Sequence, residues 1–170
     1  MPTMRRTNVV KLIVDRNTHE KLKELVITVA KCWNEVNWSR IQQYKRGERV
    51  DFAKTEKEVY EKYKQVLKVN TQQVARKNAE NWKSFFSLIK GKREGKLQKW
   101  FKPRPPGYWK DKNGKYKLIV IIRNDRYEVN ERVIYLKDFK LALKFKGRLK
   151  WRGKQGRLEI VYDEARRSWY

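Results

Sequence analysis

The spacing of apolar residues changes once along this chain, and that change constrains its fold. From Leu22 to Ile89, apolar residues recur at intervals of three and four, which is typical of amphipathic helices. Beyond residues 103–107, which contain three prolines and a glycine, they alternate with polar residues, as in half-buried strands. One strand-like segment, Asn8–Asp15, precedes the helical part. The sequence therefore predicts an α+β fold.

Three helices are predicted in the middle of the chain. Their expected bounds are Asn17–Tyr44, Thr55–Lys68 and Asn70–Ile89. Asn17 with Glu20, and Thr55 with Glu58, match the capping-box pattern of helix starts, and Gly91 is expected to end the third helix. Short turns between these helices predict a small helical lobe with a helix-turn-helix-like corner near residues 69–71.

Several strands are predicted after the prolines. Their expected bounds are Leu118–Ile122, Val133–Leu136, Leu141–Trp151 and Leu158–Tyr162, with a final hairpin into residues 168–170. The Asn8–Asp15 strand is apolar on both faces, so we expect it in the interior of a sheet with the late strands. This arrangement predicts an antiparallel sheet or barrel from residues 1–16 and 103–170, with residues 17–102 inserted as the helical lobe.

The charge balance points to a polyanionic partner. The chain has 44 Lys and Arg against 19 Asp and Glu, a formal net charge of +25, which exceeds what solubility requires. Nucleic acid is the first candidate, because the apolar runs are too short to span a membrane. The N-terminal segment contains Lys11 and no uninterrupted apolar stretch, so we expect no signal peptide, and an intracellular protein without a membrane partner.

Cysteine and histidine are too scarce for several kinds of site. Cys32 and His19 are the single residues of their types, which excludes a disulfide framework and a Cys/His zinc site within this sequence. We expect Cys32 in the core and His19 in solvent. Trp82 and Phe85 lie at helical spacing and, with Phe86, are predicted to join the third helix to the first. No cofactor, metal or small-molecule substrate is expected.

Two clusters of basic residues are candidate binding surfaces. The first comprises Lys92, Arg93, Lys96, Lys99, Lys102 and Arg104 and contains the aromatic residues Trp100, Phe101, Tyr108 and Trp109. The second comprises Lys144, Lys146, Arg148, Lys150, Arg152 and Lys154. Cations neutralise phosphates, and flat rings stack on bases or sugars. A single run of charge is usually only a solvated face, but two runs in a chain of this charge predict RNA or phosphate binding.

Particular residues resemble the N-terminal half of the TnpB (OrfB) family of transposon-encoded RNA-guided DNA nucleases. They are Val9–Val14, Val36–Trp38, Gln72–Gln73, Trp82–Phe86, Lys102–Pro105 and the Gly156–Tyr170 hairpin. In that family an oligonucleotide-binding-like barrel, the wedge domain, contains an inserted helical recognition lobe. The resemblance therefore implies the same two-part architecture here.

The resemblance also implies partners and site residues. Members of the TnpB family bind a guide RNA and double-stranded DNA in the bacterial or archaeal cytoplasm. By this resemblance, the family's catalytic RuvC-like domain would begin after Tyr170. This chain is thus expected to bind without catalysing cleavage. By position, the candidate contacts to a target-adjacent DNA motif are Phe52, Lys68, Gln72, Gln73, Arg123 and Asn124. Gln, Asn and Arg can pair with base edges.

Alternatives to these assignments remain open at the level of sequence. Phe52 suits a hydrophobic staple before the second helix, and Gln72 and Gln73 suit simple solvent exposure. The helix-turn-helix-like corner could instead belong to a free-standing DNA-binding regulator. A metal-dependent nuclease would require carboxylates. Its candidates are Asp111, Asp125, Asp138 and Asp163.

Overall fold

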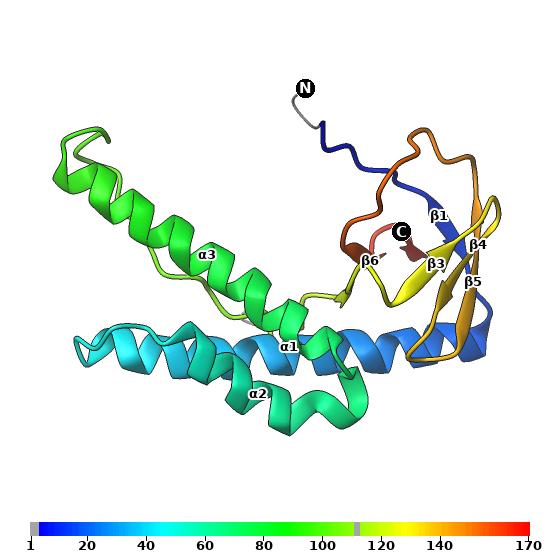
Figure 1. The fold of residues 1–170 in the computed structure, drawn as a ribbon, viewed down its shortest axis with the longest axis horizontal. Coiled ribbons are helices and arrows are strands. Elements are labelled where there is room, and N and C mark those ends of the chain that lie inside the picture. Colours follow the sequence, from blue (N-terminus) through cyan, green and yellow to red (C-terminus); the bar gives the residue numbers. More distant parts are fainter. Residues whose placement is uncertain (1–3, 111–112) are drawn as a thin grey trace. The chain divides into compact units, whose positions relative to one another are not determined.

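The computed structural model describes residues 4–110 and 113–170 (Figure 1). The described residues form three helices and two antiparallel sheets, so the predicted α+β class is confirmed. The helices are α1 (Arg16–Lys45), α2 (Phe52–Leu67) and α3 (Asn70–Arg93). The strands are β1 (Lys11–Ile13), β2 (Ile119–Ile122), β3 (Tyr127–Val129), β4 (Val133–Leu136), β5 (Leu141–Lys146), β6 (Leu158–Asp163) and β7 (Ser168–Trp169).

The helix starts differ from the predicted capping boxes. Before α1, an Asp15 carboxylate oxygen accepts a hydrogen bond from the Thr18 N–H at 2.7 Å, so Asp15 caps this helix in place of Asn17. Asp51 caps α2 in the same way, accepting from the Lys54 N–H at 3.0 Å. Thr55 is buried inside α2, where its hydroxyl donates to the Asp51 carbonyl. An aspartate just before each apolar run supplies the acceptor that the first N–H groups need.

The end of α3 also lies beyond the predicted stop. Gly91 is within the helix, which continues to Arg93. The chain turns instead at Gly95, whose φ of 71° is a left-handed conformation that favours glycine, and whose N–H donates to the Lys92 carbonyl at 3.1 Å. Gly91 therefore does not end the helix. The backbone turns at Gly95, the next glycine in the sequence.

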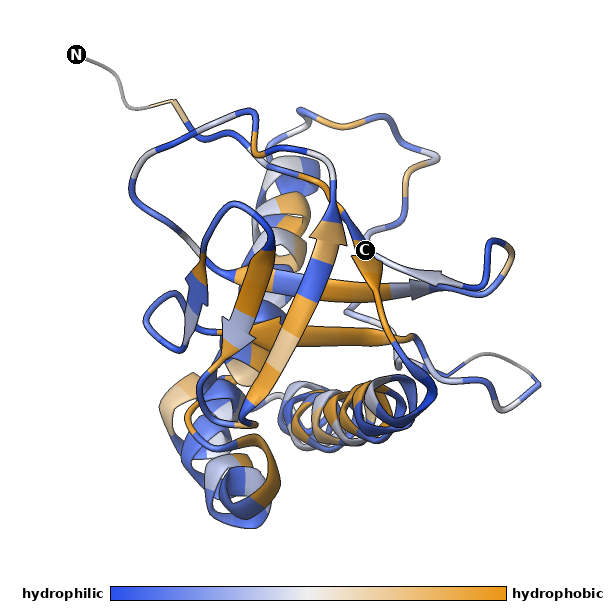
Figure 2. Cartoon of the chain, turned by 90° about the vertical axis from the view of Figure 1, so that its right-hand side faces the viewer, coloured by the Kyte–Doolittle hydropathy of each residue, from blue (hydrophilic) through white to orange (hydrophobic). Residues whose placement is uncertain are grey.

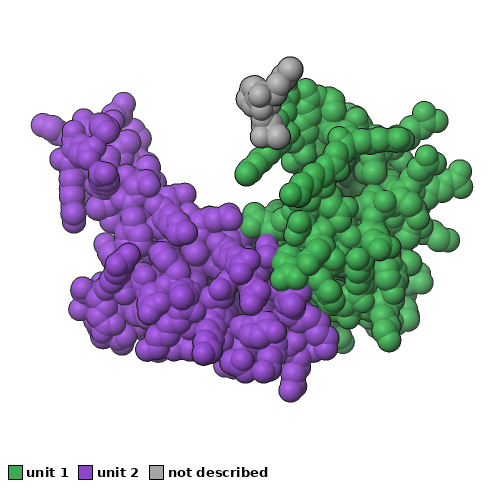
Figure 3. Space-filling model, in the orientation of Figure 1, with its two compact units in different colours: residues 1–27, 118–170 green, residues 28–117 purple. Residues whose placement is uncertain are grey.

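The chain divides into two compact units (Figure 3). Unit 1 comprises residues 1–27 and 118–170, and unit 2 comprises residues 28–117. Unit 1 contains both sheets, and unit 2 contains α2 and α3. The first boundary falls inside α1, so its residues are shared between the units.

Unit 1 is built on two sheets with strand orders β1-β5-β4-β3 and β2-β6-β7. Figure 2 shows that hydrophobic residues concentrate on the strands, and every residue of β2 is buried. In the described part of the chain, no strand pairing joins the two sheets, and neither sheet closes into a barrel. The expectation of one continuous sheet was therefore wrong. β2 pairs with β6 and not with β3, β4 or β5, which form the other sheet with β1.

The first strand is shorter and more exposed than predicted. β1 covers Lys11–Ile13 and lies at the edge of its sheet, paired only with β5 among the described strands. Leu12 is buried, whereas Ile13 is 49% exposed. An interior position was expected because both faces are apolar, but only the Leu12 face meets a core. β5 alternates buried and exposed residues as predicted until Gly147, whose φ is 99°.

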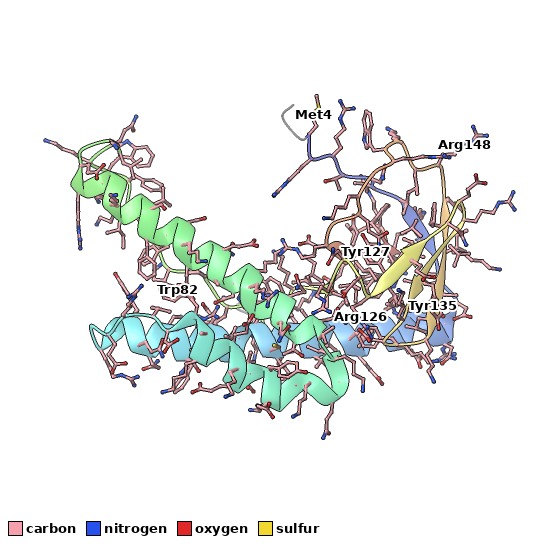
Figure 4. All side chains as sticks on the ribbon, in the orientation of Figure 1. Met4, Trp82, Arg126, Tyr127, Tyr135 and Arg148 are labelled. Atoms are coloured by element: carbon pink, nitrogen blue, oxygen red, sulfur yellow. The ribbon has the colours of Figure 1, made fainter. Side chains whose placement is uncertain are left out.

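Aromatic residues fill much of the core of unit 2. Trp82 and Phe85 of α3 are buried with Val50. The packed partners at their rim are Ile41, Phe52, Phe86 and Ile89. Figure 4 labels Trp82 beneath α3, and Tyr44 of α1 lies 5.8 Å from it between ring centroids. The predicted contact between the third and first helices is confirmed.

Candidate nucleic-acid interface

The segment that leaves the first basic cluster is fastened to α1 within unit 2. The Trp33 indole N–H donates to the Gly107 carbonyl at 2.9 Å, and the Asn37 side-chain amide donates to the Pro106 carbonyl at 2.8 Å. The Trp109 N–H donates to the Asn34 side-chain oxygen at 2.7 Å. These bonds hold the proline-containing exit in one place, so the cations that precede it extend from a fixed point.

Asn37 is the centre of a buried polar network that holds α1 to α3. Its side-chain oxygen accepts from the Asn78 amide at 3.1 Å and from the Trp82 indole N–H at 3.0 Å. Neighbouring Arg40 is 1% exposed and donates to the Thr55 hydroxyl, the Ala75 carbonyl and the Asn78 side chain. Burial lowers the pKa of Arg40 to about 10, so its guanidinium stays charged at neutral pH.

The first basic cluster is accessible on unit 2. Lys92 is half-buried, whereas Arg93, Lys96, Lys99, Lys102 and Arg104 are exposed. Trp100 is 75% exposed and Tyr108 is 46% exposed. Trp109 is 7% exposed, because its ring stacks on Trp33 with centroids 4.0 Å apart. The prediction that Trp109 offers a ring to bases was therefore wrong, and Trp100 is the accessible indole of this cluster.

The second basic cluster lies on unit 1. Lys144 and Lys146 are on the exposed face of β5, and the register places Lys11 of β1 directly opposite Lys146. Arg148, Lys150, Arg152 and Lys154 were predicted to continue the ladder of a strand, but they are exposed in the loop after Gly147. Like charges facing each other across a sheet destabilise it. An anion bound between them would relieve that repulsion.

Three of the predicted DNA-motif residues begin the helices of unit 2. Phe52 is half-buried at the start of α2, with the Arg40 guanidinium 5.1 Å and the Lys83 ammonium 5.7 Å from its ring centroid. This position suits an anchor of the helix start. Gln72 and Gln73 are half-buried in the first turn of α3. Lys68, at the turn between the helices, is exposed and has a φ of 55°.

The other two DNA-motif candidates lie in the turn between β2 and β3 of unit 1. Arg123 makes a two-pronged ion pair with Asp125, with N–O distances of 2.6 and 2.8 Å. This hydrogen bond is the main cause of the lowered pKa of Asp125. Asn124 is exposed, and its carbonyl accepts from the Gln155 side chain at 2.7 Å. The Arg123–Asp125 ion pair and the hydrogen bond from Gln155 to Asn124 thus both hold the turn.

The carboxylates considered for a metal site are paired with arginines. Asp125 pairs with Arg123, Asp138 with Arg126 and Asp163 with Arg166. Asp111 lies outside the described residues. Within residues 4–110 and 113–170, no three His, Cys, Asp or Glu side chains gather as a metal-binding group. Asp125, Asp138 and Asp163 are therefore occupied in holding surface arginines.

His19 and Cys32 have different environments from each other. Cys32 is buried as predicted, and burial raises the pKa of its thiol. His19 was expected in solvent, but its Nδ1 accepts from the Trp169 indole N–H at 2.9 Å and its ring meets Tyr162 edge to face. Sequence patterns could not reveal this contact, because His19 and Trp169 are 150 positions apart. It fastens the start of α1 to β7 inside unit 1.

Comparison with known proteins identifies a relative over almost the entire chain. No family model matches the sequence. A TnpB-like protein, ORF457 of Acidianus two-tailed virus, is 51% identical over 171 residues. This chain is related to the TnpB-like proteins. The alignment covers 98% of this chain and 37% of the relative, so this chain spans little more than a third of that protein's length. The resemblance predicted from the sequence motifs is confirmed.

The surface of this chain is basic on both units. Among the described residues, no helix combines the length and the hydrophobicity that crossing a bilayer requires.

Sequence reasoning missed three residues beside the second cluster, namely Arg6, Asn8 and Trp151. Their only local signal was a pair of arginines before the first strand.

Proposed function

We propose that this chain is the nucleic-acid-binding part of a TnpB-like RNA-guided DNA endonuclease. It binds a guide RNA and a target-adjacent DNA motif, and cleavage belongs to a part of the protein outside this sequence. The observation that carries this proposal is the exposure of both basic clusters on a chain with a formal net charge of +25. Relationship to a TnpB-like protein over 98% of the chain supports the same function.

The two units have different roles in this proposal. Unit 1 corresponds to the wedge domain of the family, and unit 2 to its recognition lobe. β1 of one sheet contacts β7 of the other, which supports this correspondence although neither sheet closes into a barrel among the described residues. The RNA phosphates contact the two basic clusters defined above. Charge on flexible lysines and arginines supplies affinity without reading sequence.

Reading of the DNA motif falls to polar residues at helix and strand ends. Gln72, Gln73 and Lys68 are candidates on unit 2, and Asn124 and Arg123 are candidates on unit 1. Amides pair with adenine edges and guanidinium groups pair with guanine. Phe52 supports the start of α2 and acts through that helix. Arg123 would reach a base while Asp125 orients its guanidinium.

Salt dependence of RNA binding tests this function. Binding of the purified chain to a structured RNA should weaken roughly 100-fold or more between 50 and 200 mM salt. Replacement of Lys144 and Lys146 by Glu should weaken binding strongly. The same replacement at Lys21 and Lys31, which are exposed on α1, is the matched control and should have a smaller effect.

Two other outcomes would contradict the proposal. An affinity that does not change with salt would remove its electrostatic basis. A dimer that binds a specific duplex tightly and ignores RNA would favour the free-standing regulator instead. Light scattering and competition between duplex DNA and structured RNA measure both properties in the same preparation.

A further inference from the structure

Two segments of unit 1 that are far apart in sequence form one basic surface. We name residues 4–10 the arm and residues 147–156 the loop. The Asn8 side-chain oxygen accepts from the N–H groups of Lys150 and Trp151, at 3.0 Å each, and its amide donates to the Trp151 carbonyl at 3.0 Å. Asn8 thereby makes three bonds to the backbone of the loop, as a neighbouring strand would.

An arginine of the arm lies on an indole of the loop. The Arg6 guanidinium carbon is 3.8 Å from the Trp151 ring centroid, which is a close cation–π contact. Arg6 also donates to the Met4 sulfur at 3.2 Å. Trp151 is still 42% exposed beneath this stack, and Arg6 itself is exposed. A planar platform therefore remains open to solvent.

The loop is fastened at its other end as well. The Gln155 amide donates to the carbonyls of Asn124 and Tyr127, at 2.7 and 2.9 Å, and the Tyr127 hydroxyl donates to the Gly156 carbonyl at 2.7 Å. Leu149, which directly precedes the first attachment, is half-buried. A loop rich in glycine and lysine is thus held in a defined conformation, which lowers the entropy lost when a ligand binds.

The charge around this platform has one sign. Residues 4–11 and 144–157 contain ten Lys and Arg and no Asp or Glu. Among the described residues, Arg157 is the one cation of this set in an ion pair, with Glu159 at 3.6 Å. Figure 4 shows Arg148 projecting outward from unit 1. Lys11 and Lys146 face each other across β1 and β5. Phosphates are the anions that such a row of cations fits.

We propose that the arm and the loop form a binding site for an unpaired nucleotide strand, with one base stacked on the Arg6–Trp151 pair and phosphates along the flanking cations. A duplex keeps its bases stacked on one another, whereas an unpaired strand can present a base to an aromatic or guanidinium plane. Asn8 is a positioning residue, because it holds the loop that carries Trp151. This inference rests on the proposed function and assigns residues that the sequence clusters did not include.

Binding of the whole chain to fluorescent oligonucleotides tests the site. The probes are a single-stranded RNA of mixed sequence, the same sequence as single-stranded DNA, and the corresponding duplex. Arg6→Lys keeps the charge and Trp151→Leu keeps an apolar side chain, but each removes the planar stack. Each should weaken single-strand binding roughly five- to 100-fold and leave the dependence on salt unchanged. Arg16→Ala, which removes an exposed cation outside the site, is the control and should change it less than twofold.

The outcomes separate this site from the general proposal. If the wild-type chain binds none of the probes, both proposals are wrong. If it binds, but Arg6→Lys and Trp151→Leu bind single strands as tightly as wild type, the site alone is wrong. Equal loss on the duplex would also overturn it, since a duplex offers no base to the stack. Loss on RNA alone, or on both single strands, supports the site and identifies which strand it takes.

Limited trypsin digestion tests the role of Asn8 independently of affinity. The loop offers cleavage after Arg148, Lys150, Arg152 and Lys154. Asn8→Ala should increase cleavage at these positions in the free protein, while the melting temperature of the chain changes little. Addition of single-stranded RNA should protect them in the wild-type chain. Unchanged cleavage in Asn8→Ala would show that Asn8 does not position the loop.

Discussion

The indole rings of Trp33 and Trp109 lie stacked face to face, with centroids 4.0 Å apart and planes 7° from parallel. Trp33 is on α1, and Trp109 follows the proline-containing exit. Both rings are nearly inaccessible, at 1% and 7% exposure. The stacked pair attaches the segment that follows the first basic cluster to the helical core of unit 2. Truncating it should therefore affect stability and the placement of the cluster together.

Trp109→Ala is expected to lower the free energy of unfolding by about 3–5 kcal/mol, because a large buried ring is lost and its stacking partner is left facing a cavity. Urea denaturation followed by circular dichroism measures the change. Trp100→Ala removes the same side chain from a position that is 75% exposed and should cost little. Equal effects of the two replacements would contradict the assignment of Trp109 to the core.

Asn37→Ala should destabilise the helical unit more than an exposed asparagine replacement on α3. The variant leaves the Trp82 and Asn78 donors buried without their acceptor, and each such group costs about 1–3 kcal/mol. Asn81 is exposed on α3, so Asn81→Ala is the matched control. Thermal unfolding by calorimetry compares them. Similar melting temperatures would mean that water satisfies the network when Asn37 is absent.

Arg40→Lys should also destabilise the helical unit, although it keeps the charge. The guanidinium reaches partners on α2 and α3 at once, through Thr55, Ala75 and Asn78. The single ammonium group of lysine cannot donate to all of these partners in the planar, forked geometry of a guanidinium. We expect a loss of about 1–3 kcal/mol for the unsatisfied groups, measured by urea denaturation. Lys83→Arg, the reverse exchange at an exposed position of α3, should be close to neutral.

Asp15→Ala should have an effect on stability that depends on pH. The Thr18 backbone N–H, followed by the Thr18 side chain, lowers the pKa of Asp15 below its ordinary value of 3.8. The folded protein thus favours the carboxylate, and this contribution is complete above pH 3.8 and is lost as the pH falls below it. The difference in melting temperature between wild type and variant should stay constant at higher pH and shrink as the pH falls below about 4. Glu131→Ala, in an exposed turn, should show no such trend.

Replacements at polar and cationic positions should separate sequence reading from phosphate binding. Gln72→Ala or Asn124→Ala should change discrimination between DNA motifs by about 1–3 kcal/mol if these amides contact base edges. Lys146→Ala or Lys150→Ala should weaken binding to every sequence alike and reduce its salt dependence. Binding to a randomised duplex library, measured with guide RNA bound, distinguishes the two patterns. Uniform losses for all four variants would contradict the division of roles.

Local signals in the sequence predicted the three helices and most of the strands, but not β3. β4 has the predicted bounds, Val133–Leu136, and β5 alternates buried and exposed residues as expected, because a half-buried strand has a period of two. The helix starts were missed by a few residues, since Asp15 and Asp51 compete with the capping-box residues for the same N–H groups. The pairing of strands was not predictable from periodicity, which does not specify partners.

The sequence by itself determined the kinds of element, their order and the surplus of positive charge, because propensity, periodicity and composition act over short stretches. Only the tertiary structure decided which indole is buried and which is exposed, and which polar residues hold the chain together. Asn8 and Trp151 meet across 143 positions, and Trp33 meets Gly107 across 74. Such contacts depend on how distant backbone segments pack, and no local pattern records that packing.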